Sequence, residues 1–245
     1  MHEHELWLTA LFNDHLAGPA NSILNAVRMP AEHPERPWQN WIVMELLVVA
    51  ILAVLLPFDR ARFSVDKPGR LQHLFEITYN FVGEQMGELG IHHGEQYLPY
   101  FGTLFIFILF MNLLGIIPTF DSPTMYPMVP LGLALCTFFY YHAKGVKELG
   151  IGKYLLQFVG PIPAMALLMV PIELTGHLAR PMSLTIRLFA NMYAGEQVTN
   201  SFLSLTKFII PAVFMALHVF VAFLQAYIFM LLSMIYVAMA TSHEH

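Results

Sequence analysis

Four charged side chains stand within residues 171–196, a stretch that is otherwise apolar enough to enter a lipid bilayer: Glu173, Arg180, Arg187 and Glu196. A charge at that depth costs several kcal/mol, so such residues normally face protein or water and serve a function. Glu173, Arg180 and Arg187 follow one another at intervals of seven, which is two helical turns and returns each side chain to nearly the same face. The spacing predicts a membrane helix with a polar stripe, as an ion path requires.

The composition is that of an integral membrane protein. Hydrophobic residues make up 57% of the chain and charged residues 12%, against about 25% charged in an ordinary soluble domain. The single cysteine, Cys136, excludes a disulfide framework and a thiolate metal site. The sequence has no Walker loop, zinc-ligand spacing or nucleophile elbow, so we predict no catalytic site, no metal and no cofactor.

We expect an all-α fold with about five membrane-embedded helices plus one amphipathic surface helix, because several nearly uncharged runs approach the roughly 20 residues that a crossing needs. One membrane domain, residues 1–245, should contain an outer N-terminal segment at 1–40, a first helix at 41–58, an amphipathic surface helix at 69–90, transmembrane helices at 96–120 and 126–143, and an oblique channel hairpin at 161–203 and 208–240.

The last two segments are too long to stand upright in a bilayer. At about 1.5 Å per residue they would measure about 50 to 60 Å, whereas the hydrocarbon core is about 30 Å thick. They are therefore expected to form a long, strongly tilted antiparallel hairpin. The surface helix has the opposite character: Leu71, Leu74, Val82 and Met86 share one face of a helix whose other face is polar.

Basic residues predict the orientation. Four lie after the first span, at 60–70, and three lie after the third, at 144–153, which makes both segments cytoplasmic by the positive-inside rule. The N-terminus is then outside, the C-terminus is cytoplasmic, and the hairpin tip near Lys207 faces outward.

Counting back from that tip along two antiparallel helices places Glu196 level with His218 and Arg187 level with Gln225. Asn191 stands one turn from Arg187. On the inward side Glu173 and His177 share a face, and Arg180 and Ser183 lead from them toward Arg187, as the sequence places them. The polar groups divide into an outer and an inner set, with Arg187 between them.

A purely structural explanation stays open for several of these residues. Asn191, Gln225 and Ser183 could simply join helices by hydrogen bonds. Glu173, His177 and Arg180 could form a local salt-bridged motif, and Glu45 could be a residue of the membrane interface or contact another subunit. Arg187 is harder to explain in this way, because a permanent cation near the middle of the membrane needs a partner or a water-filled cavity.

These segments closely resemble subunit a of the F-type ATP synthase in its bacterial form. The resemblance covers nearly all of the chain in order, and His177 and the histidine-rich N-terminus lie outside it. It rests on SLTIRLFANMYAGE at 183–196 and HVFVAFLQAYIFMLLSMIYVAMA at 218–240, with support from NLLGIIP at 112–118 and PIEL at 171–174.

The resemblance implies a non-catalytic stator subunit that forms two offset proton half-channels. Arg187 matches the family's essential arginine, which prevents a proton short-circuit. Glu173 and Ser183 look like the polar positions of the cytoplasmic side, and we add His177 to that pathway. The positions that match the half-channels of the family are Asn191, Glu196, His218 and Gln225.

The resemblance also implies partners and a location. The partners are a rotating ring of c subunits whose carboxylates face Arg187, peripheral-stalk b subunits, the rest of the ATP synthase complex and the lipid bilayer, with no nucleic acid. The location is the bacterial inner membrane. The main alternative is a self-contained ion-coupled secondary transporter or cation channel, but such proteins usually have two related halves, which this sequence lacks. A structural membrane scaffold is a third reading.

Overall fold

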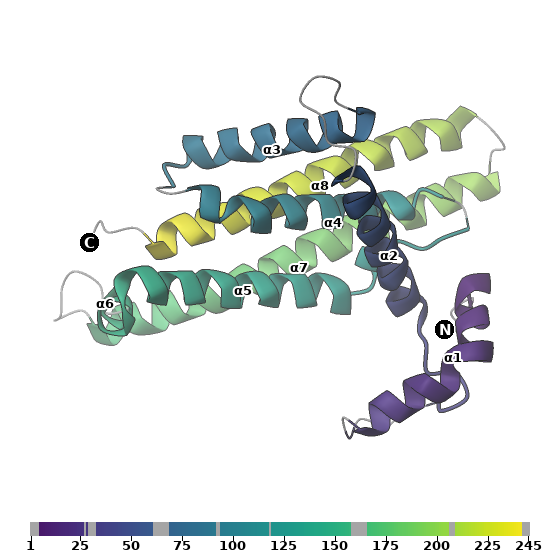
Figure 1. The fold of residues 1–245 in the computed structure, drawn as a ribbon, viewed down its shortest axis with the longest axis horizontal. Helices are drawn as coiled ribbons and strands as arrows, with labels where there is room; N and C mark the ends of the chain where they lie inside the picture. The colour runs from purple at the N-terminus through teal and green to yellow at the C-terminus, as the bar shows by residue number, and fades with distance from the viewer. Residues whose placement is uncertain are drawn as a thin grey trace.

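The computed structural model describes residues 5–26, 28, 33–60, 69–91, 94–117, 119–157, 166–205 and 209–241. Within them the structure is helical and has no strands, which confirms the all-α prediction (Figure 1). The elements are α1 (Trp7–Ala26), α2 (Asn40–Arg60), α3 (Arg70–Glu88), η1 (Gly94–Gln96), α4 (Leu98–Leu114), η2 (Pro123–Met125), α5 (Met128–Leu149), α6 (Ile151–Gln157), α7 (Ala166–Leu205) and α8 (Ile209–Thr241).

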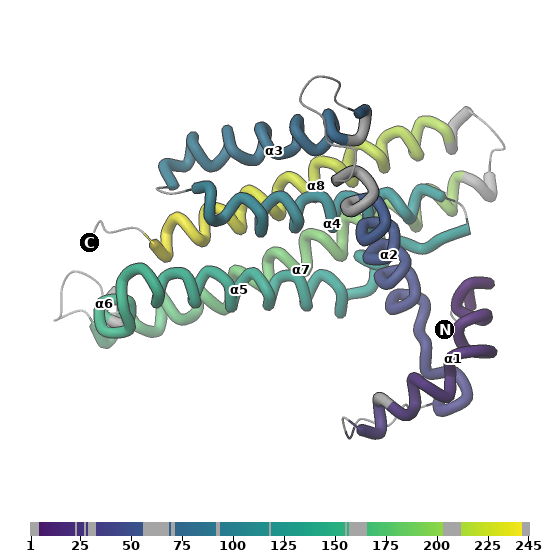
Figure 2. Tube along the Cα trace, viewed as in Figure 1, coloured from purple at the N-terminus to yellow at the C-terminus, as the bar shows by residue number. Residues whose placement is uncertain are grey.

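Helices α3, α4, α5, α7 and α8 extend along the long axis of the molecule, whereas α2 crosses them steeply (Figure 1). The tube in Figure 2 shows the same crossing and places α1 beyond the N-terminal end of α2. Helix α2 has 21 residues and is therefore about 31 Å long, close to the thickness of a hydrocarbon core of about 30 Å. Helix α2 therefore has the length of an upright membrane crossing, and its direction differs from that of α3, α4, α5, α7 and α8.

Helix α8 lies at the centre of the packing, because it contacts α4, α5 and α7. Its buried positions recur every three or four residues, which is the period of one helix face. Several of them are small, and small residues let helix backbones approach closely in membranes. The buried residues of α8 include Ala222, Ala226, Phe229, Met230, Ser233, Met234, Val237 and Ala240.

A buried polar network joins η2 to α4 and α4 to α8. Asn112 donates to the backbone oxygen of Ala222 at 3.1 Å and accepts from Thr124 at 2.7 Å. Ser122 donates to the backbone oxygen of Met111 at 3.1 Å and shares a hydrogen bond with Thr124 at 2.7 Å. All three polar side chains are fully buried. Because each of these side chains is hydrogen-bonded, the network stabilises the fold and avoids the free-energy cost of unpaired buried polar groups.

Few of the described helices would be recognised as membrane spans from their own length and hydropathy. Of the described helices, the stretch Ala212–Thr241 is long and apolar enough to cross a membrane, and Asn40–Leu55 and Leu98–Leu114 are shorter apolar helices. Helix α7 carries the four charges that interrupt its apolar surface. It also continues through Pro171 and Pro181, where Thr175 and Thr185 donate to the proline carbonyls at 2.7 Å.

The structure differs from the sequence-based expectation in several places. The outer segment contains a helix, α1, and a short helix, α6, follows α5. The segment expected at 96–120 is a shorter helix, because α4 ends at Leu114 and a turn begins at Gly115. Along α3, Val82 and Met86 are buried in the protein and Leu74 is 52% exposed, which is compatible with an apolar face turned to lipid. The histidines at 2, 4, 92, 93, 243 and 245 lie outside the described residues.

Two glycines of α5 allow a matched test of the packing. An added Cβ at Gly145 would lie 2.5 Å from Cε2 of Tyr154 and 2.8 Å from the backbone oxygen of Ala240. Overpacking of this kind costs about 1–3 kcal/mol. We therefore expect Gly145→Ala to lower the melting temperature of the purified protein in detergent by several degrees.

The control is Gly132→Ala, because nothing lies within 4 Å of a Cβ at that position. Its melting temperature should stay the same or rise, since alanine favours a helix over glycine by about 1 kcal/mol. Equal melting temperatures for the two variants would contradict the close packing of α5 against α6 and α8.

Candidate functional site

The polar residues of α7 and α8 face one another along a seam between the two helices. Asn191 of α7 donates to Oε1 of Gln225 on α8 at 2.7 Å. Nearer the C-terminal end of α7 and the N-terminal end of α8, the imidazole of His218 lies against Gly195. A Cβ added at Gly195 would be 3.1 Å from Nδ1 of His218. Since 191 pairs with 225 and 195 with 218, the two helices run antiparallel.

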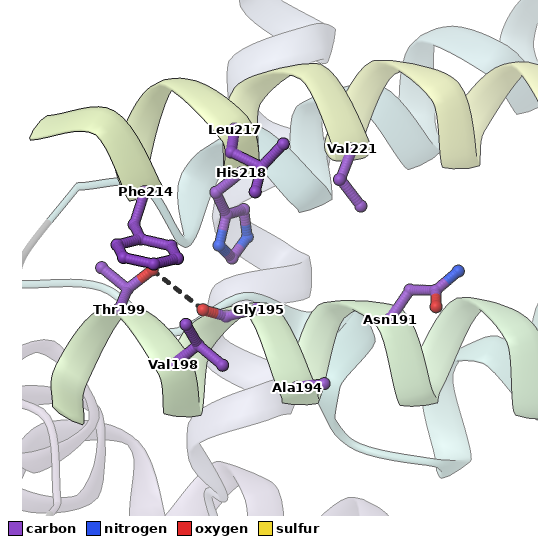
Figure 3. A pocket seen from close by; sticks show the side chains of 9 residues that line it. All are labelled: Asn191, Ala194, Gly195, Val198, Thr199, Phe214, Leu217, His218 and Val221. Atoms are coloured by element: carbon purple, nitrogen blue, oxygen red, sulfur yellow. Dashed lines mark hydrogen bonds between the residues drawn. The ribbon is translucent and has the colours of Figure 1, made fainter. Parts of the chain in front are cut away.

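A pocket of about 370 Å³ opens along this seam. Figure 3 shows Phe214 and Thr199 at one end, Asn191 at the other, and His218 pointing from α8 toward Gly195. The hydroxyl of Thr199 donates to the Gly195 carbonyl at 2.8 Å, so it does not compete for the imidazole. The absence of a side chain on Gly195 leaves room for the His218 ring.

Three buried atoms beside this seam have no hydrogen-bond partner in the part of the chain that the structure describes: Oε2 of Glu196, Nε2 of His218 and Nε2 of Gln225. Buried polar atoms are nearly always hydrogen-bonded, to protein or to ordered water. A carboxyl and an imidazole are also the side chains that exchange protons most readily near neutral pH. The seam therefore has the chemistry of a hydrated proton path.

Arg187 is half-buried and lies on a different surface. It lines an open groove of about 500 Å³ together with Ala179, Met182, Ser183 and Ile186. Among the described residues its guanidinium makes no hydrogen bond and no ion pair. An arginine side chain has five N–H donors and stays charged at any physiological pH, so it offers a binding site for an anionic group from outside the chain.

The inner set forms a compact cluster. Nε2 of His177 is 3.3 Å from Oε1 of Glu173, and Nη2 of Arg180 is 3.9 Å from the same oxygen. The local salt-bridged motif that the sequence left open is therefore present. Ser183 is not part of it, because its side chain is exposed and lies with Arg187 in the groove.

The structure thus brings together some of the expected residues and separates others. His218 lies against Gly195, the neighbour of the expected Glu196, and Gln225 binds Asn191 instead of Arg187. Two contributors were missed. Asp121 lies close enough for its charge to act on Glu196. Tyr141 shares a hydrogen bond with His177. The sequence signals that could have identified them were an acid in the segment before the span expected at 126–143 and the run Tyr140, Tyr141, His142 at the end of that span.

Comparison with known proteins agrees with this geometry. A family model described as ATP synthase A chain matches residues 41–238. The ATP synthase subunit a of Solibacter usitatus (strain Ellin6076) is 60% identical over 235 residues, which are 96% of this chain and 100% of that protein. The corresponding protein of Koribacter versatilis (strain Ellin345) is 48% identical over 243 residues, 99% of each chain. That of Aquifex aeolicus (strain VF5) is 39% identical over 212 residues, 83% of this chain and 97% of its own.

The match extends over the helices that carry the seam, the groove and the inner cluster, and the relatives are matched over almost their full lengths. A helical chain of membrane-protein composition, whose Arg187 makes no ion pair among the described residues, fits that relationship. The chain belongs to the ATP synthase subunit a family.

Proposed function

We propose that this chain is the stator of the ATP synthase membrane sector and forms two offset proton half-channels beside a rotating ring of c subunits. The observation that carries the proposal is the position of Arg187. It lines an open groove and makes no hydrogen bond or ion pair among the described residues, and its groove lies between the seam and the inner cluster. A half-buried permanent cation within a membrane is best satisfied by an anion from another subunit.

A carboxylic acid on each ring subunit would supply that anion. While it faces lipid, the acid has to be protonated, because burying the ion costs far more than burying the neutral form. When it comes to Arg187 it can ionise, because the guanidinium stabilises the carboxylate. The arginine thus sets the one place on the ring's path where a proton leaves and another is taken up.

The two polar sets then serve as separate routes to the ring. Protons enter from outside along Glu196, His218, Asn191 and Gln225, and leave by way of Ser183 and Glu173. Arg187 blocks a direct passage between the routes, since it repels protons and cannot give one up. Each charge that crosses 100 mV releases about 2.3 kcal/mol, which biases the direction of rotation. The subunit directs protons and performs no catalysis itself.

The directions of the helices support a particular placement in the membrane. If α2 stands upright, the helices along the long axis of Figure 1 are strongly tilted, and α7 with α8 forms an oblique hairpin that offers a long surface to a curved ring. We place about five helices in the membrane and α3 on its surface. The N-terminus lies outside, the C-terminus lies in the cytoplasm of a bacterial cell, and peripheral-stalk b subunits bind away from the ring.

Cross-linking tests the proposed ring interface. Ile186 is 57% exposed beside Arg187, so a cysteine at 186, introduced after Cys136→Ser, should form a disulfide with a cysteine placed near the carboxylate of the c subunit. Oxidation of the assembled complex and denaturing electrophoresis would reveal the a–c product.

A cysteine at 54 is the matched control, because Val54 is 67% exposed on α2, which contacts neither α7 nor α8 extensively. It should give no a–c product. Cross-linking at 54 but not at 186 would place the ring on the wrong face of the molecule and contradict the proposal. Failure to recover any multicopy partner would instead favour the self-contained transporter.

A further inference from the structure

The inner cluster contains a hydrogen-bonded chain that links side chains of two helices, α5 and α7, to Glu173. The hydroxyl of Tyr141 on α5 is 3.0 Å from Nδ1 of His177 on α7, and Nε2 of His177 is 3.3 Å from the Glu173 carboxylate. Tyr141 is 1% exposed and His177 8% exposed, whereas the Glu173 side chain is 44% exposed. The chain therefore runs from the protein interior to an accessible carboxylate.

The geometry assigns the proton on the imidazole. Nη1 of Arg180 lies 3.4 Å from the same Nδ1 that faces Tyr141, and a guanidinium nitrogen can only donate. Nδ1 is therefore the acceptor, which leaves the hydrogen of the neutral ring on Nε2. That hydrogen points to the carboxylate of Glu173. The opposite tautomer would place two lone pairs against each other at Nε2 and two donors against each other at Nδ1.

The surroundings hold this arrangement in place. The Arg180 guanidinium lies over the rings of Tyr236 at 5.3 Å and Tyr141 at 6.0 Å, so it is fixed by cation–π contacts from α8 and α5. The His142 ring lies beside that of His177, with centroids 5.0 Å apart and planes tilted by 33°, and it shares a hydrogen bond of 2.5 Å with Tyr154 of α6. Outside the spans, burial raises the pKa of Tyr154 to about 12, so it remains a neutral hydroxyl.

We propose that Tyr141 and His177 are positioning residues for Glu173, which they orient as the proton-accepting group at the inner end of the half-channel. This inference rests on the proposed function. His177 competes with Arg180 for the carboxylate and holds it by the shorter contact, so Glu173 is not committed to an ion pair with Arg180. Tyr141 acts one step further away, because its hydroxyl secures the tautomer of His177 that can donate.

Two amides at position 177 separate this role from simple packing. In His177→Gln the amide nitrogen can take the place of Nε2 and still donate to Glu173. In His177→Asn the amide reaches only the position of Nδ1 and keeps the contact with Tyr141. We expect ATP-driven proton pumping of the reconstituted complex to stay within about twofold in His177→Gln. It should fall about tenfold in His177→Asn and His177→Leu, the size expected from losing a hydrogen bond to a charged group.

A second comparison asks whether the effect passes through Glu173. Glu173→Gln alone should lower pumping at least as much, and His177→Leu added to it should have no further effect, because residues that act through one group are non-additive. Tyr141→Phe should give an intermediate loss. Co-purification of the ring with every variant checks assembly.

Three outcomes would overturn the inference. Full pumping in His177→Leu would remove any role for the imidazole. If pumping were retained in His177→Asn but lost in His177→Gln, the contact with Tyr141 would be the one that matters, and it would serve the structure and not the orientation of Glu173. A further loss when His177→Leu is added to Glu173→Gln would show that His177 acts independently of the carboxylate. If Arg187→Gln pumps normally, the proposed function fails instead, whatever the variants at 177 do.

Discussion

ATP-driven proton pumping should be abolished by Arg187→Gln in a complex that still assembles. Glutamine keeps much of the length of the side chain but removes the charge, so an ionised ring carboxylate loses the cation that stabilises it, and the ring stops releasing protons at the stator. Passive proton leak through the membrane sector should be retained, because the charge that separates the two half-channels is gone. The measurement is acidification of liposomes after addition of ATP, followed by leak under an imposed potential.

Arg36→Gln makes the same substitution at an arginine of the N-terminal segment whose side chain is 68% exposed, and it should pump like the wild type. Arg187→Lys keeps a cation at this position, but one that can lose its proton, so it should not form a tight barrier. Undiminished pumping in Arg187→Gln would mean that the arginine is structural. The mechanism would then be wrong even though the family assignment stands.

Much of this site is predictable from local patterns. Charges at intervals of seven in an apolar stretch identify Arg187 and Glu173, and the length of the last two segments predicts two long helices that have to lie side by side. What such patterns specify is the level of a residue along a helix and the face it occupies. They do not specify which side chain across the seam it meets, and Gln225 accordingly binds Asn191, one turn from the expected Arg187.

The elements that sequence reasoning missed depend on contacts between distant segments. Helix α1 contains Gly18 and Pro19, which disfavour a helix, but Asn13 of α1 binds the backbone of Trp38 in both directions and the Trp38 indole donates to Leu16. The Tyr141–His177 contact likewise joins residues 36 positions apart on two helices. Periodicity reports the face of each helix, whereas such contacts depend on which helices pack together.

The second large effect should come from Glu196→Gln, which removes a titratable group from the outer path while conserving the shape of the side chain. Oε2 of Glu196 is buried and without a partner in the described structure, so an amide there fills the same space but cannot pass a proton on. We expect both pumping and passive leak to fall by about 10²-fold or more, the usual contribution of a positioned proton-transfer group. Leak is measured on the membrane sector under an imposed potential.

The leak distinguishes the two variants, because a barrier and a carrier have opposite effects on it. Passive proton leak should persist in Arg187→Gln, which removes the barrier, and should be lost in Glu196→Gln, which removes the proton carrier. The neighbouring exposed residue Gln197 supplies the control, since Gln197→Ala changes a polar side chain one position away and should alter neither rate. If Glu196→Gln retained leak and pumping together, protons would reach the seam by His218 alone. A double variant of Arg187→Gln with Glu196→Gln should show the closed phenotype, because a path without its carrier conducts nothing whether or not the barrier is present.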